Sequence, residues 1–331
     1  MEKKKINFVG FWSNFDKEHN IFTNILREAF EVEVSETPDY VFASPLCAPF
    51  EYLKYDCVRI LFTGEPLVPD FNVFDYAIGF DYLSFPDEIT QTRYYRYPLC
   101  FYNYERIKQA TSGMSYDTAK TILNQKKYFC NFMYGHQSAN GERELLFQLI
   151  NKYKRVESAG SFLNNMPEGM VIPYSDKKLE FQKLCKFSIA CESISYPGFV
   201  TEKLMDPFLS ASVPIYYGNS LVDKEFNPRA FINLHDYDSF EAGVERVIQI
   251  DQDDSLYLQM LMEPKIITSD YIDNLFIGLR SFLLSIFSQN PDCAYRRLRH
   301  YIQKSHEQYM NEYRLFSKSL VYRVYRKLTK L

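Results

Sequence analysis

Residues 196–218 read YPGFVTEKLMDPFLSASVPIYYG, and this stretch decides the fold that the sequence predicts. A loop that contains Pro197 and Gly198 comes first, and Thr201 then stands where a helix would be capped. The stretch closes on the apolar run 213–217, which has the pattern of a buried strand. A loop, a helix start and a buried strand in this order predict the αβ half of a doubly wound domain.

The predicted helix start at Thr201 has the chemistry of a phosphate site. Its free backbone N–H groups and the positive end of its dipole attract anions. Lys203 adds a full positive charge within the first turn, and Glu202 beside it can accept hydrogen bonds from a ribose. The pattern therefore indicates a nucleotide pocket in which Glu202 and Lys203 bind the donor.

Four blocks of the sequence carry a resemblance to a known family. Residues 199–218, FVTEKLMDPFLSASVPIYYG, match the pattern YVTEK…SxTxPIYWG. The other blocks are FTGEPLVPDFNVFDYAIGFDYL at 62–83, CNFMYGHQSANGERELLFQLI at 130–150 and FNPRAFINLHDYDSF at 226–240. In sequence and in order these blocks resemble a bacterial α-1,3/4-fucosyltransferase of glycosyltransferase family 10, over residues 55–290.

The resemblance implies an α/β fold of two Rossmann-like domains that face each other across a cleft, the GT-B type. Residues 1–154 would bind the acceptor, residues 155–290 would bind GDP-fucose, and residues 291–331 would form a C-terminal amphipathic basic helix. The implied reaction is inverting transfer of L-fucose from GDP-fucose to O3 of GlcNAc in a galactosyl-N-acetylglucosamine (Lewis-type) acceptor. O3 or O4 linkage, and a lipopolysaccharide, capsule or free glycan as acceptor, stay open.

Glu65 is the candidate general base. It follows the strand predicted over residues 58–63, at the end of a parallel strand where α/β enzymes build their sites. From its spacing alone, a carboxylate on a loop framed by Gly64 and Pro66 is more simply a solvated glutamate. The resemblance favours the catalytic role, because the family places its base at this TGE motif.

Arg143 is the candidate partner of Lys203 on the donor diphosphate. It lies in the first turn of the helix predicted after the turn at 138–141, where a cation opposes the helix dipole. A bound phosphate would offset that cost, and the resemblance assigns the family's diphosphate arginine to this position. An ordinary surface arginine is the alternative.

Glu192 and Phe199 complete the predicted donor site. Glu192 ends the strand predicted over residues 187–192 and is expected to bond to the sugar or ribose, with structural anchoring as the alternative. Phe199 replaces a tyrosine of the family pattern, so a hydrogen bond is lost while a flat ring remains for the donor. Ser193 replaces an asparagine, and Pro207 is expected to give the predicted helix a kink or a short first turn.

A run of tyrosines follows the fourth predicted strand, at residues 74–80. These side chains could line an acceptor groove or pack the surface of the domain, and their spacing does not separate the two interpretations. They are Tyr94, Tyr95, Tyr97, Tyr102 and Tyr104.

The composition is that of a soluble globular protein of two domains, with 331 residues, 46% hydrophobic and 24% charged. Its seven cysteines show no CxxC pair and are interpreted as buried thiols in a reducing compartment. The five histidines lack metal-ligand spacing, and Asp236–Tyr237–Asp238 is more simply a loop than a metal-holding DxD motif. No cofactor and no nucleic-acid partner are expected, and a divalent metal would at most stimulate the reaction.

The two ends of the chain bear on its location. The apolar run after MEKKK is too short for a signal peptide, so we expect a cytoplasmic protein.

The C-terminal segment is basic. From residue 291 onward there are ten Lys or Arg and three Asp or Glu, a net charge of +7 that leaves −11 for the rest of the chain. One helical face there is apolar: Phe316, Leu320, Val321, Val324, Leu328 and Leu331. Basic residues lie around the other: Arg314, Lys318, Arg323, Arg326 and Lys330. This pattern predicts a helix at the anionic inner face of a membrane, with a homo-oligomerisation helix as the alternative.

Two other function classes compete with the transferase. A glycosidase would use two of these carboxylates but would leave Lys203 and Arg143 without a role. A non-catalytic, membrane-associated sugar-nucleotide-binding protein would use both cations and would not depend on Glu65. Turnover of GDP-fucose separates the three classes.

Overall fold

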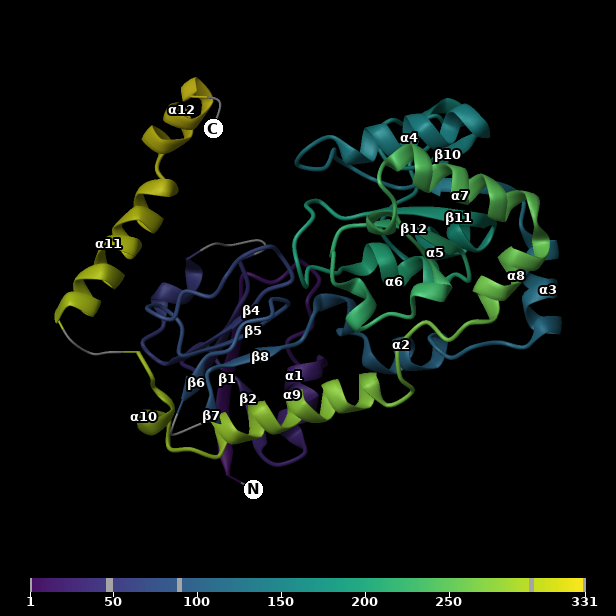
Figure 1. The fold of residues 1–331 in the computed structure, drawn as a ribbon. Helices are drawn as coiled ribbons and strands as arrows, with labels where there is room; N and C mark the ends of the chain where they lie inside the picture. The colour runs from purple at the N-terminus through teal and green to yellow at the C-terminus, as the bar shows by residue number, and fades with distance from the viewer. Residues whose placement is uncertain (1, 46–49, 88–90, 298–300, 330–331) are drawn as a thin grey trace. The chain divides into compact units, whose positions relative to one another are not determined.

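The computed structural model divides the chain into two compact units. Unit 1 comprises residues 1–97 and 275–331, and unit 2 comprises residues 98–274. The structure describes residues 2–45, 50–87, 91–297 and 301–329. Each unit is built around a parallel β-sheet with helices packed on it (Figure 1). The predicted α/β fold of two Rossmann-like domains is thereby confirmed at the level of each unit.

The sheet of unit 1 has six parallel strands in the order β2-β1-β3-β4-β5-β8. They are β1 Lys3–Val9, β2 Glu31–Val34, β3 Tyr40–Ala43, β4 Val58–Phe62, β5 Tyr76–Gly79 and β8 Tyr94–Arg96. β3, β4 and β5 are buried at every residue, as strands covered on both faces should be. A short antiparallel pair, β6 (Pro86–Asp87) and β7 (Gln91–Thr92), stands beside this sheet.

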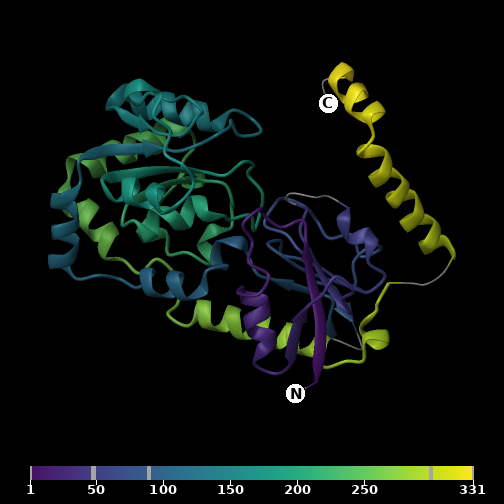
Figure 2. The same ribbon diagram turned by 180° about the vertical axis from the view of Figure 1, so that it is seen from behind.

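Helices α1 (Ile21–Arg27) and α9 (Tyr271–Phe287) pack on this sheet, and Figure 2 shows both from behind. Asn20 caps α1, because its side chain accepts hydrogen bonds from the backbone N–H groups of Phe22 and Thr23. At the far end of α9, the ring of Phe287 stacks on Tyr40 of β3 with 4.1 Å between centroids. α9 lies within residues 155–290, the predicted second domain, but it packs on the sheet of unit 1.

The sheet of unit 2 has five parallel strands in the order β10-β9-β11-β12-β13. They are β9 Tyr128–Phe132, β10 Val156–Ser158, β11 Cys185–Cys191, β12 Val213–Tyr217 and β13 Ile232–Asn233. The helices of this unit are α2 Tyr104–Ala110, α3 Tyr116–Gln125, α4 Glu142–Tyr153, α5 Asp176–Lys183, α6 Glu202–Leu209, α7 Phe240–Gln252 and α8 Asp254–Met262.

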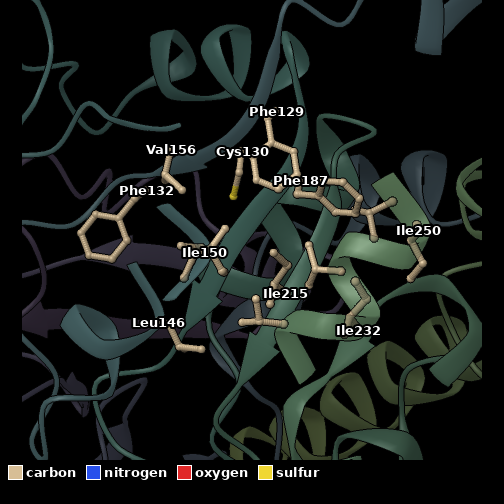
Figure 3. Packing of buried hydrophobic residues seen from close by; sticks show 14 of the residues in the cluster. Phe129, Cys130, Phe132, Leu146, Ile150, Val156, Phe187, Ile215, Ile232 and Ile250 are labelled. Atoms are coloured by element: carbon tan, nitrogen blue, oxygen red, sulfur yellow. The ribbon is translucent and has the colours of Figure 1, made fainter. Parts of the chain in front are cut away.

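One apolar cluster joins the sheet of unit 2 to its helices, and Figure 3 shows its packing. Leu146 and Ile150 of α4 meet Phe132 of β9, while Ile215 of β12 and Ile250 of α7 close the other side. All five side chains are 1% exposed or less. This core fixes the strand ends on which the candidate site is built.

The predicted domain boundary between residues 154 and 155 is wrong. The division falls between Tyr97 and Pro98, because β9 pairs with β10 and β11 and so belongs to the second sheet. The chain also returns to unit 1 within α9. Strand pairing over long sequence separations decides these boundaries, and the spacing of apolar runs does not show which sheet a strand joins.

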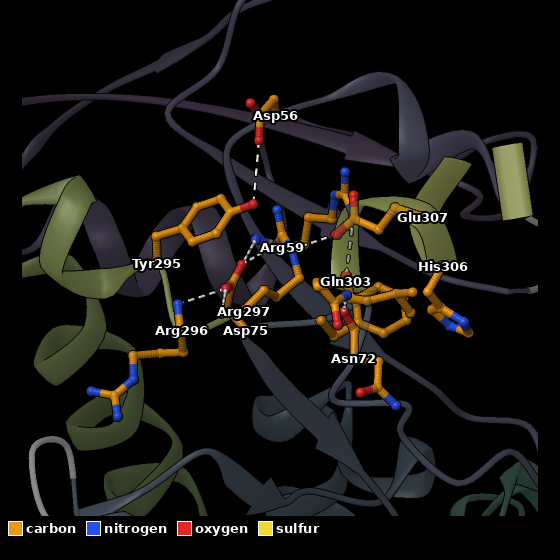
Figure 4. A network of polar contacts seen from close by, with 12 residues as sticks. Asp56, Arg59, Asn72, Asp75, Tyr295, Arg296, Arg297, Gln303, His306 and Glu307 are labelled. Atoms are coloured by element: carbon orange, nitrogen blue, oxygen red, sulfur yellow. Dashed lines mark hydrogen bonds and ion pairs between the residues drawn. The ribbon is translucent and has the colours of Figure 1, made fainter. Parts of the chain in front are cut away.

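The C-terminal segment belongs to unit 1 through a buried cluster of charges. It contains α10 (Pro291–Ala294), α11 (Tyr301–Ser317) and α12 (Leu320–Thr329). Arg297 forms an ion pair with Asp75, drawn in Figure 4. Both side chains are fully buried. Glu307 of α11 lies 3.1 Å from Arg59 and 3.2 Å from Arg297. The segment up to α11 is thus part of the first fold and not a separate tail.

Glu307→Ala is expected to destabilise unit 1 by about 1.5–3 kcal/mol, because Arg59 and Arg297 would each lose a charged hydrogen-bond partner. Urea unfolding measures the change. The control is Glu312→Ala, since Glu312 is exposed on the same helix and accepts a hydrogen bond from Gln308. Equal unfolding midpoints for the two variants would contradict the stabilising role of the cluster.

Candidate active site

The candidate site of unit 2 is built where β11 ends and α6 begins. Glu192 directly follows β11, and Thr201 is the N-cap of α6. The Glu192 carboxylate accepts hydrogen bonds from the Thr201 backbone N–H at 2.8 Å and from its hydroxyl at 2.7 Å. Thr201 Oγ1 in turn accepts a hydrogen bond from Lys203 Nζ at 3.1 Å. The end of the strand and the start of the helix are therefore locked together by side chains.

Glu192 is fully enclosed in this arrangement. Its residue is 1% exposed, and Thr201 engages both of its carboxylate oxygens. Burial raises the pKa of Glu192, and the charge of Lys203 opposes that rise. The structure favours the anchoring alternative for this residue, because no carboxylate oxygen is exposed to meet a donor.

Lys203 lies between two carboxylates. Its Nζ is 3.1 Å from Glu202 Oε1 and 3.5 Å from Glu192 Oε2. Burial alone would lower the pKa of Lys203, but the charges of Glu192 and Glu202 outweigh it and raise that pKa. The side chain is 19% exposed, so the site holds a permanent cation that solvent can still reach.

Glu202 is more open to solvent than Lys203 and Glu192, with 29% of its side chain exposed. Burial would raise its pKa, but the positive charges of Lys203 and Lys178 prevail and lower it. Glu202 is therefore a carboxylate at neutral pH. It can accept hydrogen bonds, as the sequence analysis requires of a ribose ligand.

Arg143 is 5% exposed. This burial excludes the alternative that Arg143 is an ordinary surface arginine. Its Nε donates to the Cys191 carbonyl at 3.2 Å, and its Nη1 donates to the His136 carbonyl at 2.9 Å. The guanidinium also stands 4.3 Å from the ring centroid of Tyr134. Within the part of the chain that the structure describes, no residue accepts a hydrogen bond from Nη2. One edge of a firmly held guanidinium is thus left for a ligand.

Arg143 and Lys203 both belong to unit 2, whereas the sequence analysis assigned them to different domains. The corrected boundary explains this, because α4 packs on the second sheet. The two cations are close enough that the charge of Arg143 opposes the rise in the pKa of Lys203. Both cations therefore belong to one unit, and their convergence on a single diphosphate stays a prediction.

Phe199 packs in the interior and is 2% exposed, so its ring face is not presented to solvent. The neighbouring Gly198 has φ +86°, and its N–H donates to Asn219 Oδ1 at 2.7 Å. α6 continues through Pro207 without a break and ends two residues later, so its first turn is not cut short, and the expected kink stays a prediction. The donor contact of Phe199 stays a prediction.

Four residues in and around this site were not singled out from the sequence. Asn219 is fully buried, and its Nδ2 has no partner among the described residues. A Cβ on Gly218 would lie 2.5 Å from Glu192 Cγ, so only glycine lets the two strand ends approach. Their position directly after the predicted strand 213–217 was the available signal. Lys178 of α5 donates to Asp206 of α6 at 2.8 Å, and no local pattern marks that pair.

Glu65 lies in unit 1, three residues beyond the end of β4. Its side chain is exposed, and Thr63 shapes the turn by accepting from the Glu65 N–H at 3.2 Å. The Thr63 hydroxyl also donates to the Glu65 carbonyl at 2.9 Å. The structure brings the other five predicted site residues together in unit 2 and places Glu65 on the sheet edge of unit 1.

Of the five tyrosines for which groove lining and packing were both open, two are buried and three are half-buried. Tyr94 and Tyr97 are 4% and 1% exposed, which favours the packing interpretation for these two residues. Tyr95 donates to the Leu275 carbonyl at 2.9 Å, and the Tyr104 hydroxyl bonds to Asp273. These side chains hold elements together within their own units.

The described ranges contain no group of three His, Cys, Asp or Glu side chains placed to hold a metal ion. Asp236 accepts a hydrogen bond from Asn233 at 2.9 Å, which fits the loop interpretation of the Asp-Tyr-Asp pattern. Among the described helices, none is both long and apolar enough to cross a bilayer.

Comparison with known proteins adds a family to this geometry. A model of the α-(1,3)-fucosyltransferase FucT N-terminal domain matches residues 6–104, and a model of the glycosyltransferase family 10 (fucosyltransferase) C-terminal region matches residues 123–262. The α-(1,3)-fucosyltransferase FucT of Helicobacter pylori is 29% identical over 307 residues. That alignment covers 80% of this chain and 61% of the H. pylori protein, so the chain spans about three fifths of its relative.

Solved structures share the fold. An α1,3-fucosyltransferase crystallised with GDP-fucose superposes with a TM-score of 0.65 over 86% of this chain and 91% of that chain. Another crystal structure of an α1,3-fucosyltransferase gives a TM-score of 0.68 over 85% of this chain and 90% of that chain. Both are 24% identical to this sequence and support the predicted type of fold.

Proposed function

This chain belongs to glycosyltransferase family 10, the fucosyltransferases, and we propose from that membership and from its site that it transfers L-fucose from GDP-fucose to O3 of GlcNAc in a galactosyl-N-acetylglucosamine acceptor of a surface glycan. The observation that carries the proposal is the site of unit 2. There, Lys203 lies in the first turn of α6, and Arg143 of α4 is held by the carbonyl of Cys191, the residue before Glu192. Two fixed cations beside a helix start suit a diphosphate.

The chemistry needs a base and a clamp on the leaving group. Unlike a glycosidase, a transferase that uses a sugar nucleotide needs no acid, because the diphosphate is already a good leaving group. Glu65 takes the proton from the acceptor O3, which forms a bond to C1 of fucose from the face opposite the diphosphate. The bond from C1 to the β-phosphate oxygen breaks, and GDP departs with the electron pair.

Each residue of the site then has a part that follows from its geometry. Lys203 and Arg143 offset the charge that builds on the β-phosphate, since fixed donors aimed at developing charge lower the barrier most. Glu202, with its exposed carboxylate, holds the ribose. Glu192 acts as a positioning residue, because it holds the Thr201 turn that presents Lys203. Phe199 supports the loop beneath the donor.

A donor screen tests this proposal. The full chain is incubated with GDP-fucose or another GDP-sugar, with and without a β-galactosyl-N-acetylglucosamine disaccharide, and the product linkage is determined. We expect acceptor-dependent release of GDP and an α-1,3-fucosylated product, and we expect transfer to persist in EDTA. Release of fucose from a fucosylated glycan without nucleotide would identify a glycosidase. GDP binding without turnover would identify a non-catalytic binder.

We further propose that α12 binds the anionic inner face of a membrane, so that the protein is cytoplasmic and peripheral. Its exposed apolar side chains are Leu320 76%, Val321 67%, Val324 50% and Leu328 79%. Arg323, Arg326 and Lys327 lie on the same short helix. Leu331 of the predicted apolar face and Lys330 of the predicted basic face lie outside the described residues. Arg314 departs from the expected solvated face, because it is buried and lies 3.6 Å from Glu51.

Truncation after Ser319 should abolish most sedimentation with anionic liposomes and preserve transfer to soluble acceptors. The cut falls after Glu307, because removing Glu307 would also break the buried charge cluster. A matched variant with Arg323, Arg326 and Lys327 changed to glutamine should lose binding to anionic vesicles in particular. Equal sedimentation before and after truncation would rule out the membrane role, and a shift in molecular mass instead would identify an oligomerisation helix.

A further inference from the structure

Unit 1 exposes aromatic rings at the same sheet edge that carries Glu65. Tyr82 is 40% exposed and Phe85 is 39% exposed, whereas Phe62 and Phe80 at the ends of β4 and β5 are buried. Arg96 and Arg93 lie against these two rings. We call Tyr82, Phe85, Arg93 and Arg96 the aromatic ledge. Exposed aromatic surface of this kind marks binding sites more often than scattered single residues do.

The strand register places the ledge next to the candidate base. β4 and β5 are neighbouring parallel strands, as Figure 1 shows, and Phe62 lies opposite Ile78. The Thr63 N–H still donates to the Ile78 carbonyl at 3.0 Å beyond the end of β4. Glu65 lies three residues past the end of β4, and Tyr82 lies three residues past the end of β5. Parallel strands end at one edge, so the carboxylate and the ring belong to adjacent loops.

Cations hold the rings of the ledge in place. The Arg96 guanidinium stands 4.0 Å from the Tyr82 ring centroid, and Arg93 stands 5.3 Å from that of Phe85. Arg93 is itself fixed, because it donates to the Asp75 carbonyl at 2.7 Å and to the Phe74 carbonyl at 2.8 Å. Phe71 packs on Phe85 with 4.4 Å between centroids. Rings that are already ordered lose little conformational entropy when a ligand binds.

We propose that the aromatic ledge is a subsite for a sugar ring of the acceptor glycan. The apolar C–H face of a pyranose would pack on the exposed ring of Tyr82 or Phe85. The proposal rests on the proposed function, because Glu65 as base requires the acceptor at this edge. Flat exposed rings suit a small polar ligand with one apolar face.

Acceptor kinetics of three Tyr82 variants test the subsite. Tyr82→Ala and Tyr82→Leu should raise KM for the galactosyl-N-acetylglucosamine acceptor about tenfold, equivalent to about 1.4 kcal/mol. Tyr82→Phe should keep the normal KM, because stacking needs the ring and not the hydroxyl. KM for GDP-fucose and kcat should stay unchanged in all three. The control is Tyr116→Ala in unit 2, since Tyr116 is 52% exposed and also pairs with a cation, Lys120.

A second readout separates failure of the subsite from failure of the proposed function. Saturation-transfer NMR on the full chain without donor measures binding of the acceptor disaccharide directly. Wild-type binding that is lost in Tyr82→Leu and kept in Tyr82→Phe would support the subsite even if no fucose were transferred. An acceptor KM equal to that of Tyr116→Ala, or no disaccharide binding by the wild type, would overturn it. Loss of liposome binding with normal acceptor KM would reassign the ledge to a membrane surface.

Discussion

Replacing Glu65 with glutamine should lower kcat by roughly 10²–10⁴, the usual contribution of a positioned general base. Glutamine keeps the size of the side chain but cannot accept the proton of the acceptor hydroxyl. The hydrogen bonds from Thr63 that shape this turn go to backbone atoms of residue 65, which glutamine keeps. GDP affinity should be unchanged, because all residues of the proposed donor site belong to unit 2.

Steady-state transfer and a GDP titration together measure this separation of turnover from binding. The matched control is Asp70→Asn, since Asp70 is an exposed carboxylate farther along the same loop. Its side chain accepts a hydrogen bond from the Asn72 N–H, which an asparagine oxygen can also accept. Near-normal turnover of Glu65→Gln would exclude Glu65 as the general base. A non-catalytic sugar-nucleotide-binding protein would bind GDP equally in both variants and turn over in neither.

Lys203→Ala should weaken GDP binding and lower kcat by roughly 10²–10³, by analogy with the loss of one donor to a developing oxyanion. Lys203 is the cation that both Glu192 and Glu202 face, so its removal leaves two carboxylates at the place where the diphosphate should bind. Lys203→Arg should restore part of the affinity, because the charge is kept while the reach of the side chain changes.

The control for Lys203 comes from the neighbouring helix. α5 begins with Ser175 as N-cap, Asp176 and Lys177, which repeats the order Thr201, Glu202, Lys203 at the start of α6. Lys177 is exposed, so Lys177→Ala removes a lysine at the same helical position without touching the site. Equal GDP affinity for Lys203→Ala and Lys177→Ala would exclude Lys203 from the diphosphate clamp.

Sequence reasoning succeeded where the signal is local. The run 213–217 coincides with β12, and Thr201 caps α6 as its spacing indicated. Thr201, Glu202 and Lys203 are contiguous, so one correct helix start places all three. The domain boundary failed because it depends on β9 pairing with β11, which no apolar run announces.

The remaining differences arise from contacts between distant parts of the chain. Asp75 and Arg297 are 222 residues apart in sequence, so their buried ion pair could not be predicted from either neighbourhood. Glu192 was expected to face a ligand, but the Thr201 turn occupies both of its oxygens. Asn219 is buried, and none of the residues that the structure describes bonds to its Nδ2, a property that only the folded chain reveals.

A crystal structure of the full chain with GDP tests the central claim most directly. The account predicts β-phosphate oxygens within about 3 Å of both Lys203 Nζ and Arg143 Nη2, the distance of charge-assisted hydrogen bonds. The ribose should lie against Glu202. A diphosphate bound elsewhere in unit 2, with both cations in their present contacts, would contradict the account.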